Sequence, residues 1–284
     1  KVEGTSRRAG EEEAWIWTSD GLGEFTIDAA EREGRGTTVL IHLKEGEDEW
    51  LEEQRLQGVV KKYSDHIALP ILLTNDDGEE VAANEASAIW SRPKSEITDE
   101  QYAEFYHHVG HAMDDPWLTL HYKAEGKIEY TGLLFVPTRQ PFDLFDPARR
   151  HAVKLYVRRI FITDEAEGLI PSYLRFLRGV VDSEDLPLNI SREMLQNSPL
   201  MRHMNQAVTR RVLTELKKKA DKKPEEYAEF WGNFGSVLKE GLYEDQERRD
   251  ELLELVRFRS TAGTDLVGLK DYVERMKEGQ EAIY

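Results

Sequence analysis

The sequence of 284 residues predicts an α/β fold of the layered α+β kind. Three observations support this class. The chain opens with short alternating apolar segments separated by glycine-containing turns, which is typical of antiparallel strands. In its middle third, apolar strand-like runs interleave with helical periodicity, as in α/β layered domains. From about Ser198 onward, apolar residues recur at helical spacing only.

The first part of the chain is expected to form an antiparallel sheet, then a helix. Turns are predicted at 20–23 and 34–36, and strands at 14–18, 24–27 and 37–43. A helix is expected from about Asp48 to Tyr63, because apolar residues fall on one face. Residues 67–73 read as a short strand. The polar run 74–80 breaks all periodicity and is interpreted as a linker or hairpin, the best candidate for a domain boundary.

The middle part carries a well-marked helix start at Thr98, which forms a capping-box pattern with Gln101. The helix is expected to bury one apolar face, consisting of Tyr102, Phe105, Tyr106, Val109 and Met113. Strands are predicted over 129–136 and 153–162. Residues 171–177 are expected to be helical.

The last part is expected to be helical. Ser198 is a candidate N-cap with Pro199 at the first helical position, and Pro224 opens a second helix that Gly241 should end. Two further helices are predicted over about 245–258 and 269–277.

Composition excludes several classes of function. The net charge of −17 argues against sequence-independent nucleic-acid binding, which needs a basic surface. The chain has no cysteine, so it has no disulfides and no thiol chemistry, which fits a cytoplasmic protein. No apolar run approaches the roughly 18 residues of a membrane span, so no membrane partner is expected.

One segment, 180–196, places a cation where a helix begins. Helical spacing resumes at about Ser191, so Arg192 lies in the first turn, where free N–H groups already carry partial positive charge. An incoming anion such as a phosphate would compensate for the repulsion between the Arg192 charge and these N–H groups. Alternatively, Glu193 and the acids of 183–185 neutralise Arg192, since surface charges often contribute little. Both interpretations stay open on physical grounds.

Other candidate motifs are weaker. His107 and His111 have the spacing of a zinc site but lack a catalytic glutamate, so a solvated helix face is favoured and no metal site is predicted. The Gly-x-Gly pairs at 21–23 and 34–36 are better explained as hairpin turns than as phosphate loops. Arg158 is of interest because a strand would set it near Phe161, upstream of Arg192.

Several longer motifs resemble the heat-shock protein 90 chaperones. LYVRRIFITDEAE (155–167) and SEDLPLNISREMLQ (183–196) resemble the middle domain of that family. YSDHIALP (63–70), KSEITDE (94–100) and YVERMKEGQ (272–280) are similar to its bacterial members. The resemblance covers essentially the whole chain.

The resemblance implies a domain organisation. Residues 1–74 are similar to the C-terminal part of a GHKL-type ATP-binding domain, which gives a partial antiparallel sheet, and 75–88 form a short linker. The remainder is similar to a middle domain. It comprises a large α/β/α unit (89–221), a helical connector (222–256) and the start of a small α/β unit (257–284).

The resemblance also implies roles for residues. The catalytic arginine of the family falls on Arg192, with Asn189 and Gln196 as polar partners in its loop. Phe161 matches an aromatic residue that packs on that loop, with Arg158 nearby. Thr37 matches a threonine that lines the adenine pocket.

The implied function is that of a fragment of an ATP-dependent chaperone. ATP and Mg²⁺ would act in the full-length protein, which would be a homodimer that binds client proteins. The family's other nucleotide-binding residues would precede residue 1. The fragment alone is therefore expected to be monomeric, inactive and without bound nucleotide. The alternative is a docking module for clients or partners, formed by the helical connector and the apolar region of Leu169, Ile170 and Phe176.

Overall fold

The computed structural model describes residues 1–75, 77–146, 152–188 and 198–284. The chain forms two compact units. Unit 1 contains residues 1–59 and 75–78, and unit 2 contains residues 60–74 and 79–284. The mixture of helices and sheets confirms the predicted α/β class. The five domain ranges that the resemblance implies remain a prediction.

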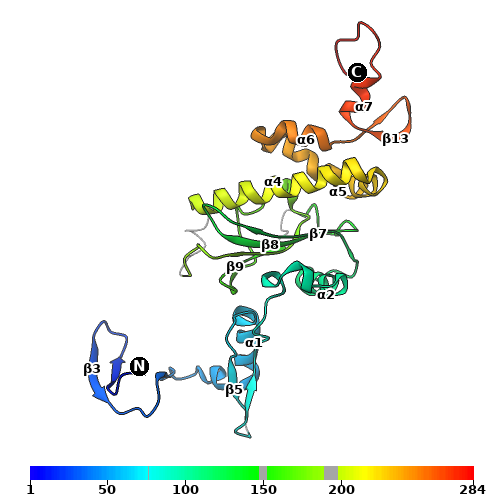
Figure 1. The fold of residues 1–284 in the computed structure, drawn as a ribbon. Helices are drawn as coiled ribbons and strands as arrows, with labels where there is room; N and C mark the ends of the chain where they lie inside the picture. The colour runs from blue at the N-terminus through cyan, green and yellow to red at the C-terminus, as the bar shows by residue number, and fades with distance from the viewer. Residues whose placement is uncertain (76, 147–151, 189–197) are drawn as a thin grey trace. The chain divides into compact units, whose positions relative to one another are not determined.

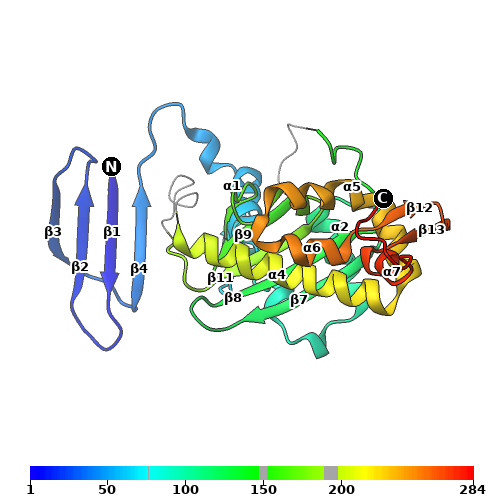
Figure 2. The same cartoon turned by 90° about the horizontal axis from the view of Figure 1, so that it is seen from above.

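Unit 1 holds a four-stranded antiparallel sheet in the order β3-β2-β1-β4, which is seen face-on in Figure 2. Its strands are β1 (Val2–Arg7), β2 (Ala14–Ser19), β3 (Phe25–Ala30) and β4 (Gly36–Ile41). The sequence predicts the last three of these. It misses β1, because this polar segment shows no apolar alternation. β1 forms because it pairs with β2 on one side and β4 on the other.

The connection to unit 2 differs in detail from the prediction. The expected helix over 48–63 is a 3-10 turn, Asp48–Leu51, followed by helix α1 (Glu53–Ser64). The expected strand over 67–73 shortens to β5 (Leu72–Thr74), which pairs with β6 (Glu80–Ala82). The polar run 74–80 therefore closes a β-hairpin, one of the two alternatives left open.

Unit 2 is built on a five-stranded mixed sheet in the order β10-β9-β11-β8-β7. Its strands are β7 (Pro116–Ala124), β8 (Tyr130–Pro137), β9 (Ala152–Val157), β10 (Ile160–Thr163) and β11 (Arg178–Ser183). β11 runs parallel to β9, and the other pairs are antiparallel. The single strand expected over 153–162 is wrong. Arg158 and Arg159 adopt positive φ angles of 50° and 66° and turn the chain back on itself.

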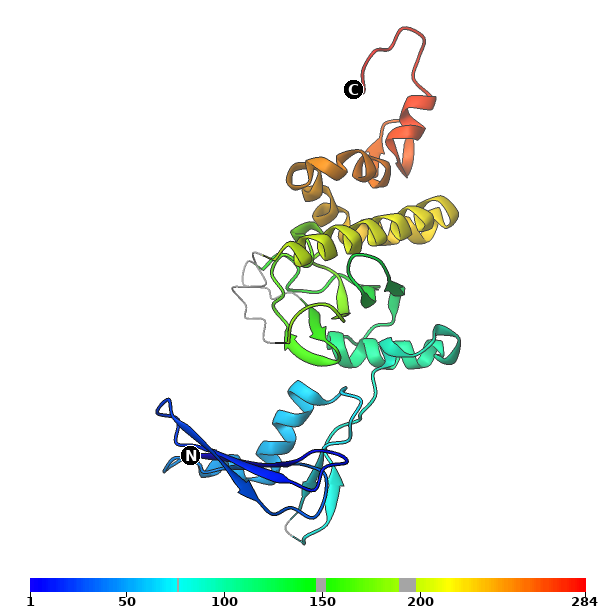
Figure 3. The same cartoon turned by 60° about the vertical axis from the view of Figure 1, so that its left-hand side comes forward.

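Helices cover both faces of this sheet, as Figures 1 and 3 show. Helix α2 (Asp99–Gly110) packs on one face. Helices α4 (Pro199–Lys222) and α5 (Pro224–Glu244) lie on the other. Each face has its own apolar core, one containing Trp90, Tyr106 and Phe135 and the other containing Leu134, Phe176 and Phe230. The expected burial of Met113 is wrong, because this residue follows the end of α2 and is fully exposed.

The remaining elements begin or end at residues that differ from the predicted ones. Helix α5 continues past Gly241, which is buried, to Glu244. The helix expected over 171–177 is a 3-10 turn at Ser172–Leu174. The final elements are α6 (Arg249–Leu255), the hairpin strands β12 (Phe258–Ser260) and β13 (Gly263–Val267), and α7 (Leu269–Glu274). The hairpin was not predicted.

Candidate functional site

The predicted catalytic segment, residues 189–196, follows strand β11 and precedes helix α4 in the sequence. Arg192, Asn189 and Gln196 fall outside the described residues, so their predicted roles stay predictions. The structure does describe both flanks of the segment. These are the C-terminal end of β11 with residues 184–188, and the start of α4, where Ser198 occupies the N-cap position before Pro199.

A buried carboxylate fixes the end of β11. Asp182 is 5% exposed, and its side chain accepts a hydrogen bond from the indole Nε1 of Trp90 at 2.8 Å. The backbone N–H of Arg159 lies 3.1 Å from both of its carboxylate oxygens. Burial raises the pKa of the Asp182 carboxyl above its ordinary value, and the two donors oppose this shift. Asp182 therefore ties three separate segments together.

Hydrogen bonds also hold the residues that follow Asp182. The hydroxyl of the fully buried Ser183 accepts hydrogen bonds from the N–H groups of Asp185, at 3.3 Å, and Leu186, at 3.2 Å. The carboxylate of Asp185 in turn accepts a hydrogen bond from the N–H of Glu129 at 2.6 Å. The chain that leaves β11 toward residue 189 therefore starts from a fixed position.

The sequence predicts Arg158 within a strand, but this residue lies in the β9–β10 turn. Its N–H donates to the carbonyl oxygen of Ser183 at 3.1 Å, and its Nε donates to that of Glu184 at the same distance. The guanidinium group is therefore bonded to the backbone just before the predicted catalytic segment. Strand periodicity did not reveal these two hydrogen bonds of Arg158 to the backbone at the end of β11.

Phe161 lies on β10 and is half-buried. Its ring packs against the rings of Tyr156 and Tyr63, with centroids 5.7 and 5.9 Å away. It belongs to the edge of the apolar core beside α2. Its predicted contact with the Arg192 loop involves residues outside the described part of the chain.

Thr37 lies on β4 of unit 1 and is exposed. Its hydroxyl is 2.8 Å from the hydroxyl of Ser6, the residue opposite it on β1. The predicted place of Thr37 in an adenine pocket stays a prediction.

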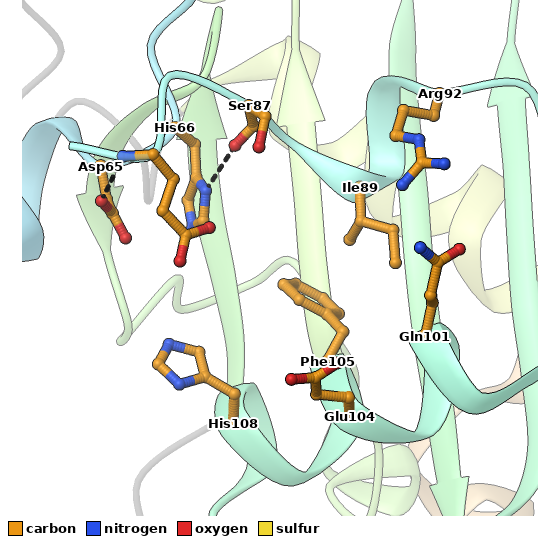
Figure 4. A pocket seen from close by; sticks show the side chains of 10 residues that line it. Asp65, His66, Ser87, Ile89, Arg92, Gln101, Glu104, Phe105 and His108 are labelled. Carbon is orange, nitrogen blue, oxygen red and sulfur yellow. Dashed lines mark hydrogen bonds between the residues drawn. The ribbon is translucent and has the colours of Figure 1, made fainter. Parts of the chain in front are cut away.

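A pocket of about 320 Å³ lies in unit 2 between the residues that follow α1, the segment 85–92 and helix α2 (Figure 4). Its lining includes Asp65, His66 and Glu85, whose potential ligand atoms lie within 4.8 Å of one another. Sequence reasoning missed this group, because Glu85 is distant in the chain and no motif links it to the Asp-His pair. The sequence instead drew attention to His107 and His111, for which a solvated helix face was favoured over a metal site. Nε2 of His107 lies 3.0 Å from the carbonyl oxygen of Asp114.

Comparison with known proteins identifies the family. The sequence model described as Hsp90 protein matches residues 74–284. Curated relatives named Chaperone protein HtpG match the whole chain. The identity is 59% for the protein of Paramagnetospirillum magneticum, 56% for that of Rhodospirillum rubrum and 54% for that of Rickettsia rickettsii. The chain covers 46%, 45% and 46% of these proteins, which is about half their length.

The family match agrees with the architecture. It spans nearly all of unit 2, including the sheet whose strand β11 leads into the predicted catalytic segment. No helix among the described residues is long and apolar enough to cross a membrane. With relatives at this level of identity along its whole length, the chain belongs to the Hsp90 protein family.

Proposed function

We propose that this chain is part of an ATP-dependent molecular chaperone and that Arg192 contacts the γ-phosphate of ATP in the full-length protein. Two findings support the proposal, namely membership of the Hsp90 family and the chaperone name of the relatives. The role of Arg192 rests on the resemblance of the motif at 183–196 to the middle domain of that family. In this proposal the full-length protein binds ATP with Mg²⁺, forms a homodimer in the cytoplasm and acts on client proteins.

The observation that carries the arginine proposal is the hydrogen-bond network at the end of β11. Asp182, Ser183 and Arg158 hold the chain in place immediately before the segment that contains Arg192. A charged group stabilises a transition state efficiently only when it is positioned in advance, because it then needs no reorganisation during the reaction. A rigid start to this segment is what an arginine needs in order to answer developing charge on a phosphoryl group.

The other predicted residues have supporting roles. Asn189 and Gln196 shape the arginine loop, Phe161 and Arg158 support it, and Thr37 contributes to the adenine pocket. The chain by itself is expected to be monomeric, to hold no nucleotide tightly and to show no ATP turnover.

The test is Arg192→Ala in the full-length protein. Removing one preorganised donor typically costs about 100- to 1000-fold in kcat, and ATP affinity should change little, because the adenine pocket is elsewhere. Arg192→Lys should restore only part of the rate, since an ammonium group lacks the planar fork of guanidinium. Arg202→Ala, at an exposed position on α4, is the matched control. Weaker ATP binding with an intact kcat would instead make Arg192 a ground-state binding residue.

A second candidate function, docking of clients or partners, is favoured by an exposed apolar pair. Met113 and Phe142 are fully exposed and line one pocket, together with Tyr106 and Arg178. Exposed apolar patches of this kind mark interaction surfaces. The expected surface at Leu169, Ile170 and Phe176 is wrong, because all three are buried in the core.

This second function is tested with the double substitution Met113→Ser and Phe142→Ser in the full-length protein. It should weaken binding of a chemically unfolded protein by about tenfold or more and leave ATP turnover unchanged. Unaltered binding would remove this surface from consideration and would leave the arginine proposal untouched.

A further inference from the structure

We propose that Asp65, His66 and Glu85 form a binding site for a divalent transition-metal ion, for which Zn²⁺ is the natural probe. The three side chains offer one ligand atom each, and these atoms lie within 4.8 Å of one another. They line the pocket of about 320 Å³ drawn in Figure 4, where Asp65 and His66 lie side by side. This site is independent of the proposed nucleotide chemistry.

The imidazole of His66 is already oriented for a metal ion. Its Nδ1 lies 2.8 Å from the carbonyl oxygen of Ser87. A carbonyl oxygen only accepts hydrogen bonds, so in the neutral ring Nδ1 carries the proton and Nε2 carries the free lone pair. Metal-bound histidines usually donate their other ring N–H to a carbonyl or carboxylate in this way. Edge-on packing on the Trp90 ring, with centroids 4.7 Å apart, further fixes the ring.

Backbone hydrogen bonds hold the two ligand-bearing segments together. The N–H of Glu85 donates to Oδ1 of Asp65, and the N–H of Ala86 donates to the carbonyl oxygen of Asp65, both at 3.0 Å. Asn84 bonds to the carbonyl oxygens of Ser64 and Leu69. Asp65 therefore presents its second carboxylate oxygen from a fixed backbone, and the site needs little ordering when an ion arrives.

The backbone between Glu85 and Ser87 is unusual. Ala86 has a φ of 51°, in the left-handed region that residues with a Cβ rarely adopt. Strained conformations of this kind persist where the surroundings over-determine them, often at ligand sites. Here the left-handed turn allows Glu85 to bond to Asp65 while the carbonyl group of Ser87 bonds to His66.

The donor set selects the class of ion. One imidazole and two carboxylates suit Zn²⁺, with bonds of about 2.0–2.2 Å, whereas Ca²⁺ and Mg²⁺ prefer oxygen ligands only. Tetrahedral ligands at such bond lengths lie about 3.4 Å apart, so the exposed Glu85 side chain has to close inward. Among the described residues no ion pair involves either carboxylate, so their charge is available to a cation. His108 lines the same pocket from α2, and Figure 4 shows it across the pocket from His66.

A bound ion would clamp the residues after α1 to the segment 84–87 and so close the loop that contains the β5–β6 hairpin. The decisive experiment is calorimetric titration of the full chain, first freed of metal with a chelator, with Zn²⁺. One site is expected. The affinity for Zn²⁺ should fall by about 10- to 100-fold or more in each of the variants Asp65→Asn, His66→Gln and Glu85→Gln. His203→Gln, which removes an exposed imidazole on α4, is the matched control and should change nothing.

Two further measurements exclude trivial explanations. Circular dichroism spectra without metal should be the same for all variants. Asp65→Asn keeps an oxygen acceptor for the N–H of Glu85, and the amide introduced by His66→Gln can still donate to the carbonyl oxygen of Ser87. With Zn²⁺, hydrogen exchange should slow over residues 64–88 in the wild type only. The proposal is overturned if the wild type does not bind Zn²⁺, or if the triple variant binds it as tightly as the wild type. It is also overturned if His203→Gln weakens binding as much as the site variants, which would indicate adventitious binding to exposed histidines.

Discussion

The four-stranded sheet of unit 1 and the five-stranded sheet of unit 2 differ in how far their strands are buried. Every residue of β4 is exposed, whereas seven of the eight residues of β8 are buried. Unit 2 has helices on both faces of its sheet, and these supply two separate apolar cores. The comparison teaches that a strand pattern predicts the strand itself, while its burial depends on a second layer.

The exposed side chains of unit 1 include residues that proteins normally cover. Phe25, Ile27, Val39 and Ile41 are each between 57% and 62% exposed. Contiguous apolar surface of this kind usually marks an interface. We therefore expect the two sheets to respond very differently to the same substitutions when the chain is studied by itself.

The largest difference should come from matched glycine substitutions. Gly179 on β11 has a φ of +125°, and a Cβ there would overlap the carbonyl oxygen of Leu133. Gly179→Ala should therefore destabilise unit 2 by roughly 4 kcal/mol or more, or prevent it from folding. Gly4, on the central strand β1 of unit 1, has nothing within 4 Å of such a Cβ. Gly4→Ala should stabilise its sheet by less than about 1 kcal/mol. Urea unfolding followed by circular dichroism measures both, and equal effects would break the comparison.

A second pair of substitutions compares apolar side chains. Leu134 on β8 is fully buried, so Leu134→Ala should cost about 2–5 kcal/mol by leaving a cavity. Val39 on β4 is 59% exposed, so Val39→Ala should cost less than about 1 kcal/mol. Thermal unfolding of each variant provides the measurement. A large cost at Val39 would mean that its face is covered in solution.

The smallest expected effect concerns pH. Burial raises the folded-state pKa of Asp182, so the folded chain holds this proton more tightly than the unfolded chain. Its contribution to stability is then complete below the ordinary aspartate pKa of about 3.9 and is lost as the pH rises through the folded-state value. The amide side chain introduced by Asp182→Asn cannot ionise. The difference in unfolding free energy between wild type and variant should therefore shift against the wild type as the pH rises from about 4. A difference that does not vary with pH would contradict the raised pKa.

Local signals in the sequence predicted the helices of unit 2 well. The capping box of Thr98 and Gln101 is present, with both reciprocal hydrogen bonds. Helix α4 begins at Pro199, and all five apolar residues expected on its inner face are buried: Met201, Met204, Val208, Val212 and Leu216. Such signals act within one turn of chain, so they can be read without knowing the fold.

The candidate site depended on contacts that sequence periodicity does not contain. Asp182 and Trp90 are 92 positions apart, and neither side chain marks itself as a partner of the other. The turn at Arg158 and Arg159 interrupts an apolar run that reads as one strand, because their positive φ angles are fixed by hydrogen bonds to the end of β11. The family resemblance supplied the roles proposed for Arg192 and its neighbours, which the described residues do not test.

By itself, the sequence determined the α/β class, the starts of helices α2, α4 and α5, and the family, because capping, periodicity and long motifs are local properties of the chain. Tertiary structure alone decided that the polar β1 is a central strand, that Met113 is exposed while Phe176 is buried, and that Asp65 and His66 meet Glu85. The physical reason is common to all three cases. Strand pairing, burial and side-chain clustering are set by which distant segments pack together, and no local pattern encodes that choice.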